Sequence, residues 1–352
     1  MPAPTPGIHH VTGIVGDAQT AVDFYAGALG LRFVKRTVNF EDVLQHHLYF
    51  GDAGGNPGTV FTAFADPHGD DGRVGKPQVE AVTFVVPAGS LEFWQSRLAD
   101  FDAPVEGPEE RFGERVLRTQ DPAGTRVELT ATDGGAAGGA DDATAGAATG
   151  DGATGAATGD ATAGTDRWTD GPVSADAAVR GIAGVSVLSV NPFATAATLE
   201  TLGFDYDRES DDRVRYRAGG DLATAVDIVH RETDFGREGP GTLHHVAVRV
   251  DAEDDLHAWR EHFDDNGYDV SRVKDRHFFH SLYVREPGGI LVELATETGG
   301  LVSDHPTPGA ALELPSFFEA DRDMIESQLP ELTVPDGQSP GRATSRDESE
   351  NP

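Results

Sequence analysis

The chain has 352 residues, enough for about two domains by the usual length of a domain. It carries 60 acidic and 27 basic residues, a formal net charge of −33, which argues against binding to nucleic acid or to an anionic membrane surface. It contains no cysteine, which excludes a disulfide framework, thiolate metal ligands and a cysteine nucleophile.

The first residues lack the basic and apolar regions of a signal peptide. No apolar run approaches the roughly 18 residues that a membrane span needs. We therefore expect a cytoplasmic protein that does not enter the membrane. The acidic excess is typical of a halophile-like surface, because a high salt concentration screens the repulsion between its charges.

The first predicted strand contains a pair of adjacent histidines, His9 and His10. A helix is expected to follow, because Asp17 is a good N-cap and Gly30 a good C-terminal stop. Its apolar positions recur at helical spacing. They are Val22, Tyr25 and Leu29. Three further strands are expected in the segment up to residue 64.

The same order of strand, helix and three strands recurs three more times. The four predicted repeats span residues 8–64, 79–130, 181–230 and 242–296. The apolar helix positions in the later repeats are Leu91, Trp94 and Leu98, then Leu199 and Leu202 before Gly203, then Leu256, Trp259 and Phe263. A βαβββ unit is too small to bury both faces of its sheet, so we expect the units to pair. The predicted fold is α+β, with four βαβββ repeats paired into two half-barrel domains.

The repeats divide the chain into two halves, residues 7–132 and 180–298. Residues 133–166 between them are almost entirely Gly, Ala, Thr and Asp and cannot bury enough surface to fold. We therefore predict a flexible linker over residues 133–179. A C-terminal tail follows from residue 299, with a helix expected over residues 314–329 and disorder from Asp336 onward.

Aligning the repeats brings two histidines into equivalent positions on the first strand. That position holds His10, Ala81, Gly184 and His245 in the four repeats, in order. The matching position on the last strand holds Thr62 or Ala63, then Glu128, Asp227 and Glu293. Repeats one and four thus offer His10, His245 and Glu293. Two histidines and one carboxylate with open positions form the facial triad of non-haem Fe(II) oxygenases.

A single histidine at the start of a strand is more often structural than metal-binding. Two at equivalent positions, with a glutamate on the matching strand, favour a metal site. Neighbouring side chains on a strand point to opposite faces, so only one histidine of each pair can face the metal. The spacing to the next acidic residue favours His10 and His245 over His9 and His244. If the triad is real, repeats one and four must share one cavity, and repeats two and three the other.

Several motifs resemble those of the vicinal oxygen chelate superfamily, which includes glyoxalase I, bleomycin-resistance proteins and type I extradiol dioxygenases. The resemblance covers residues 7–130 and 180–298. Segments 7–17, 23–31, 38–40 and 279–289 are similar to the branch that cleaves hydroquinone rings. It implies a glyoxalase-like form of the two half-barrels.

The resemblance also implies a site and a reaction. The metal would be Fe(II), with Mn(II) as an alternative, held by His10, His245 and Glu293. The implied surrounding residues are His9, Thr12, His244, Arg276 and Tyr283, with Tyr283 and His244 as the acid–base groups. The partners would be O2 and a small dihydroxylated aromatic, such as a hydroquinone or catechol.

Two other functions use the same fold. A glyoxalase-like isomerase or lyase usually has four protein ligands, and Thr62 or Ala63 is a poor fourth ligand. A non-catalytic binding protein of the bleomycin-resistance type would leave the triad unexplained.

Overall fold

The computed structural model describes residues 1–132, 168, 170–210, 212–297, 301 and 308–334. Repeat one contains β1 (Ile8–Val15), α1 (Ala18–Val22), the π-helix η1 (Asp23–Ala28), β2 (Arg32–Asn39), β3 (Asp42–Gly51) and β4 (Val60–Ala65). Repeat two contains β5 (Gln78–Pro87), η2 (Ala88–Ser90), α2 (Leu91–Asp100), β6 (Val105–Arg111), β7 (Glu114–Gln120) and β8 (Arg126–Thr132).

Repeat three contains β9 (Gly181–Leu188), α3 (Pro192–Leu202), β10 (Phe204–Glu209), β11 (Arg213–Ala218) and β12 (Ala225–Val229). Repeat four contains β13 (Thr242–Val250), α4 (Glu253–Asp265), β14 (Asp269–Val270), β15 (Lys274–Asp275), β16 (His280–Arg285) and β17 (Leu291–Thr296). Its second strand is thus split into two short pieces, β14 and β15. The chain then continues to η3 (Glu319–Asp321) and α5 (Arg322–Gln328). Among the described residues, no helix is long and apolar enough to cross a membrane.

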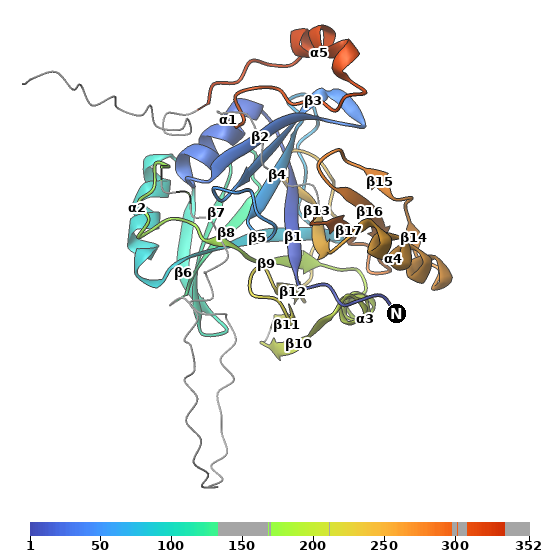
Figure 1. Cartoon of the computed structure of the whole chain (residues 1–352). Helices are drawn as coiled ribbons and strands as arrows, with labels where there is room; N and C mark the ends of the chain where they lie inside the picture. Colours follow the sequence, from blue (N-terminus) through green and yellow to red (C-terminus); the bar gives the residue numbers. More distant parts are fainter. Residues whose placement is uncertain (133–167, 169, 211, 298–300, 302–307, 335–352) are drawn as a thin grey trace, which may run out of the picture.

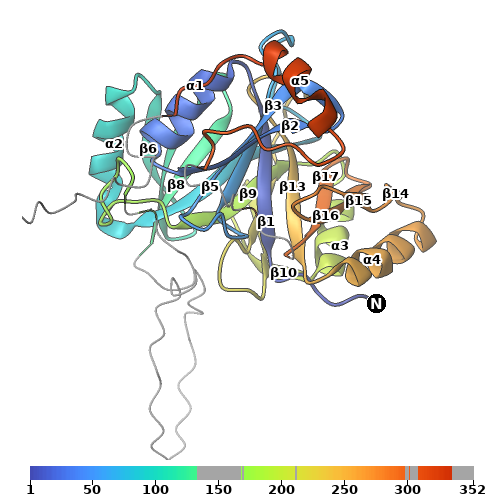
Figure 2. The same cartoon turned by 45° about the horizontal axis from the view of Figure 1, so that its top comes forward.

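The repeats pair as the triad requires. β1 pairs antiparallel with β13, and β5 pairs antiparallel with β9. In every repeat the first strand also pairs in parallel with the last strand of the same repeat. Figures 1 and 2 show β1 beside β13 at the centre of the molecule, with the helices outside the sheet. The predicted pairing of repeats one with four and two with three is confirmed, so each barrel takes one repeat from each half of the sequence.

The four predicted helices are present, and their expected apolar faces are buried. The Asp17 side chain accepts a hydrogen bond from the backbone N–H of Thr20 and begins α1. This helix widens into a π-helical turn that ends at Leu29, before Gly30 at φ 69°. Gly203, at φ 97°, ends α3 in the left-handed conformation that glycine adopts without strain.

The predicted linker must be corrected at its C-terminal end. Its low-complexity part, residues 133–166, lies outside the described residues, but residues 170–179 pack onto the body. Val173 is buried against Gly30, and the Trp94 indole N–H donates to the carbonyl of Ala177 at 3.1 Å. Trp168 also lies against the guanidinium of Arg32. Residues 170–179 contain apolar side chains that can be buried, whereas the composition of residues 133–166 offers almost none.

The predicted C-terminal helix is also shorter than expected. It was expected over residues 314–329, but α5 covers only Arg322–Gln328. Leu312 instead forms a parallel bridge with Arg36 on β2, and the N–H of Glu313 donates to the carbonyl of Arg36 at 2.9 Å. This pairing ends just before the predicted range, whose first part holds turns at residues 316–318 and then η3. The predicted disorder from Asp336 lies outside the described residues.

Candidate metal centre

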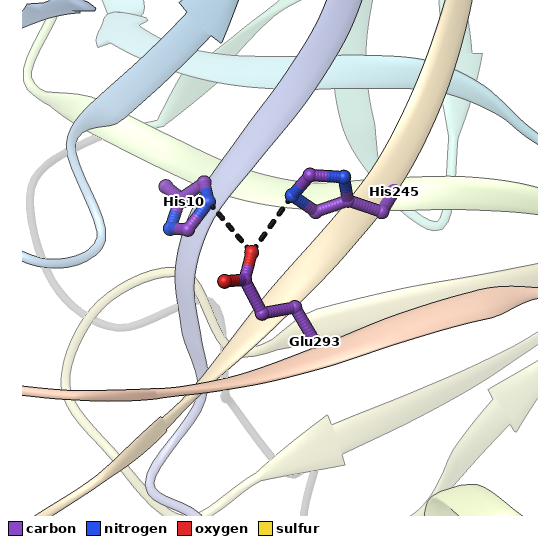
Figure 3. A group of neighbouring side chains, drawn as sticks. All are labelled: His10, His245 and Glu293. Atoms are coloured by element: carbon purple, nitrogen blue, oxygen red, sulfur yellow. Dashed lines mark ion pairs between the residues drawn. The ribbon is translucent and has the colours of Figure 1, made fainter. Parts of the chain in front are cut away.

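The three predicted metal ligands meet in the barrel of repeats one and four. His10 lies on β1, His245 on β13 and Glu293 on β17, and their exposed fractions are 3%, 2% and 1%. One ligand atom from each lies within 4.8 Å of the others. Figure 3 shows a carboxylate oxygen of Glu293 between the two rings. This atom, Oε2, lies 2.8 Å from Nε2 of His245 and 3.1 Å from Nε2 of His10.

Strand register explains why these three side chains converge. β13 lies between β1 and β17, and its Ala247 is opposite His10 on one side and Glu293 on the other. His245 is two residues before Ala247, so both point to the same face of the sheet. The small side chain of Ala247 therefore lies among the three ligands.

The same register identifies the fourth equivalent position. Thr62 on β4 lies opposite Thr12 on β1, as Glu293 lies opposite Ala247. Thr62, not Ala63, is thus the equivalent of Glu293. Its hydroxyl is 2.8 Å from the Thr12 hydroxyl and 3.0 Å from Nε2 of His47. The fourth position therefore carries a hydroxyl that is already hydrogen-bonded within the protein.

The neighbouring histidines contact the rings of the two predicted ligand histidines. Nδ1 of His9 is 3.0 Å from Nδ1 of His10, and Nδ1 of His244 is 2.7 Å from Nδ1 of His245. In each pair one nitrogen donates and the other accepts, which leaves Nε2 of the second ring facing Glu293. Ligand histidines in metal sites are commonly fixed through their second nitrogen in this way.

The protonation states suit a metal cation. Burial lowers the pKa of His245 to about 4 and, with the charge of His10, lowers that of His9 to about 3. Both imidazoles are therefore neutral at pH 7. Burial acts to raise the pKa of Glu293, but its interactions with His10 and His245 outweigh burial and hold that pKa well below its usual value. Glu293 is thus a buried carboxylate.

These residues fit a divalent metal ion. Both carboxylate oxygens of Glu293 are buried, and neither makes a hydrogen bond of good geometry with any described residue. A buried carboxylate without donors is costly unless a cation balances it. A metal about 2.1 Å from each donor atom would supply that charge and accept both imidazole lone pairs.

Thr12, Arg276 and Tyr283 also lie at the site, as their predicted roles require. The Thr12 hydroxyl is 2.9 Å from Nε2 of His245. Tyr283 is opposite Glu293 in the strand pairing, and the Arg276 guanidinium donates to its hydroxyl at 3.2 Å. Burial and the charge of Glu293 raise the pKa of Tyr283 well above its usual value, so its hydroxyl keeps its proton.

A cavity of about 30 Å³ borders the three ligands, room for one or two water molecules. Besides the predicted residues, it is lined by Asn39, Phe40, His47, Tyr49, Phe64 and Phe279. At the tip of the β2–β3 hairpin, the Glu41 carboxylate lies 2.5 Å from the Lys274 ammonium and 3.7 Å from the Arg276 guanidinium. His47 is not among the residues predicted for the site from the sequence.

The barrel of repeats two and three carries ion pairs at the equivalent positions. Arg111 binds both carboxylate oxygens of Glu128 at 2.6 and 2.9 Å. Arg215 likewise binds Asp227 at 2.7 and 3.0 Å. Ala81 occupies one of the two histidine positions there, and Gly184 the other. Guanidinium groups thus balance the two carboxylates that correspond to Glu293.

Comparisons with known proteins agree with this architecture. Residues 7–129 and 199–294 match the family described as "Glyoxalase/Bleomycin resistance protein/Dioxygenase superfamily". A Bacillus subtilis (strain 168) protein named "Putative ring-cleaving dioxygenase MhqO" is 38% identical over 332 residues, which cover 94% of this chain and 97% of its own. "Chlorohydroquinone/hydroquinone 1,2-dioxygenase" from Sphingobium indicum is 29% identical over 338 residues, which cover 92% of this chain and 96% of its own.

Solved structures give the same result. The crystal structure of a "putative dioxygenase" from Bacillus subtilis subsp. subtilis str. 168 matches with a TM-score of 0.82 and 38% identity, over 94% of this chain and 99% of that one. Glyoxalase I from Zea mays shares the fold at a TM-score of 0.57 and 13% identity, over 83% of this chain and 93% of that one. The chain therefore belongs to the glyoxalase/bleomycin resistance protein/dioxygenase superfamily, among its ring-cleaving dioxygenases.

Proposed function

We propose that the protein uses Fe(II), held by His10, His245 and Glu293, to open the ring of a dihydroxylated aromatic such as a hydroquinone or catechol. The donor set carries this proposal: two imidazoles and one carboxylate converge, while Thr62 occupies the fourth equivalent position with a hydroxyl engaged elsewhere. Three protein ligands leave positions open for substrate and O2. The name of the Sphingobium indicum relative supports the choice of substrate.

In this reaction one ring carbon–carbon bond breaks and both atoms of one O2 enter the product. The substrate supplies all the electrons, so no external reductant is needed. A bound Fe(II) ion would bring the substrate oxygen and O2 together and pass electrons between them. Mn(II) accepts the same donor set and is the alternative metal.

The surrounding side chains would handle protons and orientation. Tyr283 is protonated and held by Arg276 beside Glu293, so it can donate a hydrogen bond to a substrate oxygen at the metal. Burial lowers the pKa of His244, so this imidazole is neutral, and its Nδ1 lies 2.7 Å from Nδ1 of His245, through which it could take up a proton. His9 and Thr12 would fix the ligand rings. Because the cavity is only about 30 Å³, binding of an aromatic ring must displace side chains of its wall.

The test uses protein purified without oxygen and loaded separately with Fe(II) or Mn(II). Wild type should consume O2 with hydroquinone or catechol, and the product should gain the mass of one O2. Glu293→Ala should lose both metal and O2 uptake, because it removes the anionic ligand. Tyr283→Phe should keep its metal but turn over about a hundredfold more slowly, as expected for loss of an acid–base group. His257→Ala, on the exposed face of α4, is the control.

Two results would contradict the proposal. One is a Glu293→Ala variant that retains both metal and activity. The other is a metal-loaded wild type that takes up no O2 with any dihydroxybenzene yet isomerises a hemithioacetal, which would favour the glyoxalase-like alternative.

A further inference from the structure

The site contains a second tyrosine, Tyr49, which is the repeat equivalent of Tyr283. Tyr283 lies opposite Glu293 in the β16–β17 pairing, and Tyr49 lies opposite Thr62 in the β3–β4 pairing. Since Thr62 is the equivalent of Glu293, the two tyrosines are related by the symmetry of the barrel. Both line the cavity at the ligands, and Tyr49 is only 4% exposed.

His47 fixes the position of Tyr49. Nδ1 of His47 is 3.1 Å from the Tyr49 hydroxyl, and its Nε2 is 3.0 Å from the Thr62 hydroxyl. Because both ring nitrogens have partners, the imidazole has one orientation. Burial, followed by the charge of His10, lowers the pKa of His47 well below its usual value, so the ring is neutral and carries one N–H.

Tyr49 keeps a hydrogen-bonding function free for a ligand. Burial and the charge of Glu293 raise its pKa, so the phenol stays protonated. If Nδ1 of His47 accepts from Tyr49, the phenol oxygen is left as an acceptor; if Nδ1 donates, the O–H is left as a donor. In both tautomers, no described residue other than His47 makes a hydrogen bond to the Tyr49 hydroxyl.

The fold alone does not require this arrangement. In repeat four, the strand positions equivalent to His47 and Phe64 hold Ser281 and Ala295. In repeat one, the Phe64 ring packs against the His47 ring with their centroids 4.4 Å apart. In repeat one, therefore, His47 and Phe64 form a wall that holds a phenol on the Thr62 side of the cavity.

We propose that Tyr49, positioned by His47, hydrogen-bonds the hydroxyl group of the substrate that is not bound to the metal. The inference rests on the proposed function and refines its substrate class. Tyr283 and Arg276 would hydrogen-bond the substrate oxygen that binds the metal next to Glu293. Tyr49 would hydrogen-bond the second hydroxyl group of the substrate. The two tyrosines together would select aromatic diols over aromatics with a single hydroxyl.

The test measures binding to Fe(II)-loaded protein by calorimetry without oxygen, with hydroquinone and phenol as ligands. Tyr49→Phe and His47→Ala should each weaken hydroquinone binding about tenfold, the value of one good hydrogen bond, and leave phenol binding unchanged. His47→Asn should restore hydroquinone binding, because its amide lies near the former Nδ1. Tyr206→Phe, on the exposed edge of the other barrel, is the matched control.

Iron content and circular dichroism of each variant show whether the site and the fold are intact. Equal loss of hydroquinone and phenol binding, loss of iron, or no change in either affinity would overturn the role of Tyr49. The proposed function would stand in those cases if wild type still binds hydroquinone and consumes O2. If wild type does neither, the proposed function fails, and the role of Tyr49 fails with it.

Discussion

A single residue, Thr62, separates this site from one with four protein ligands. Thr62 occupies the position on β4 that corresponds to the position of Glu293 on β17. The Thr62 hydroxyl lies 2.8 Å from the Thr12 hydroxyl. A threonine hydroxyl is neutral and a weak ligand compared with a carboxylate. The open positions on which the proposed reaction depends therefore follow from the short, uncharged side chain at position 62.

We expect Thr62→Glu to convert the centre into a four-ligand site. A second carboxylate should slow the loss of metal to a chelator, because it adds a negative ligand, and should reduce O2 uptake with hydroquinone at least about tenfold, because it occupies an open position. Chelator competition and an oxygen electrode measure the two effects. Thr62→Ala is the control for loss of the hydroxyl. A Thr62→Glu variant with wild-type metal release and wild-type O2 uptake would show that position 62 does not face the metal.

Residue chemistry alone is sufficient to predict which three side chains lie together, but not the wall of the cavity. His10, His245 and Glu293 are distinctive residue types at repeated positions, so aligning the repeats was enough to propose them. The role of Tyr49 depends on the register of β3 against β4. In the sequence that register was ambiguous by one residue, between Thr62 and Ala63. A slip of one residue moves every side chain of a strand to the other face. The equivalence of the segments around Tyr49 and Tyr283 is visible in the sequence, but the pairing of Tyr49 with Thr62 is not.

At the scale of elements, helical spacing predicted all four repeat helices, because each buries a regular apolar face. The π-helical turn of η1 was not predictable, since its wider hydrogen bonding leaves no separate signature in the apolar pattern. The start of the predicted C-terminal helix makes tertiary contacts instead: Leu312, just before it, pairs with Arg36 on β2, and Leu314 lies in one apolar cluster with Val38. Such contacts with distant residues override local propensity.

The two barrels have diverged in how they balance buried carboxylates. In one, Glu293 faces two imidazoles and is suited to a metal. In the other, Glu128 is bound by both terminal nitrogens of Arg111, and both residues are buried. Burial acts to raise the pKa of Glu128, but the guanidinium outweighs burial and lowers it. This second barrel is thus stabilised by ion pairs where the first would hold a cation.

Breaking that ion pair should destabilise the protein without emptying the metal site. We expect Arg111→Ala to lower the free energy of unfolding by about 3 kcal/mol, because the buried Glu128 carboxylate loses its bound guanidinium and keeps the Thr83 hydroxyl, at 2.9 Å, as a donor. The double variant Arg111→Met with Glu128→Met should be much closer to wild type, since it removes both charges and fills similar volume. Denaturant unfolding at constant salt measures both effects, and iron content should be unchanged in the folded variants. If the Arg111→Ala variant is as stable as wild type, water or another arginine already neutralises Glu128.

At the scale of the whole molecule, the dominant feature is the net charge of −33. Several arginines already pair with acidic neighbours in the described part of the chain, as Arg111, Arg215 and Arg322 do. Because the chain has 60 acidic and 27 basic residues, many carboxylates cannot pair with a basic side chain, and these carboxylates repel one another. Added salt shortens the range of this repulsion from about 10 Å at 0.1 M to about 3 Å at 1 M. The folded state should benefit more than the unfolded one, because folding brings the charges closer together.

We therefore expect the melting temperature to rise steadily between 0.1 and 1 M KCl. In a chain of this size, each kcal/mol of repulsion that the salt removes should raise the melting temperature by about 2 °C. A variant that neutralises four exposed acids of α4 should melt higher at low salt and gain less from added KCl. Its substitutions are Asp254→Asn, Glu261→Gln, Asp264→Asn and Asp265→Asn, all on the solvent side of the helix. Calorimetry of both proteins across the salt series separates screening from a general effect of the salt, which would raise both melting temperatures equally. A melting temperature that stays flat or falls with KCl in the wild type would show that the acidic excess does not limit its stability.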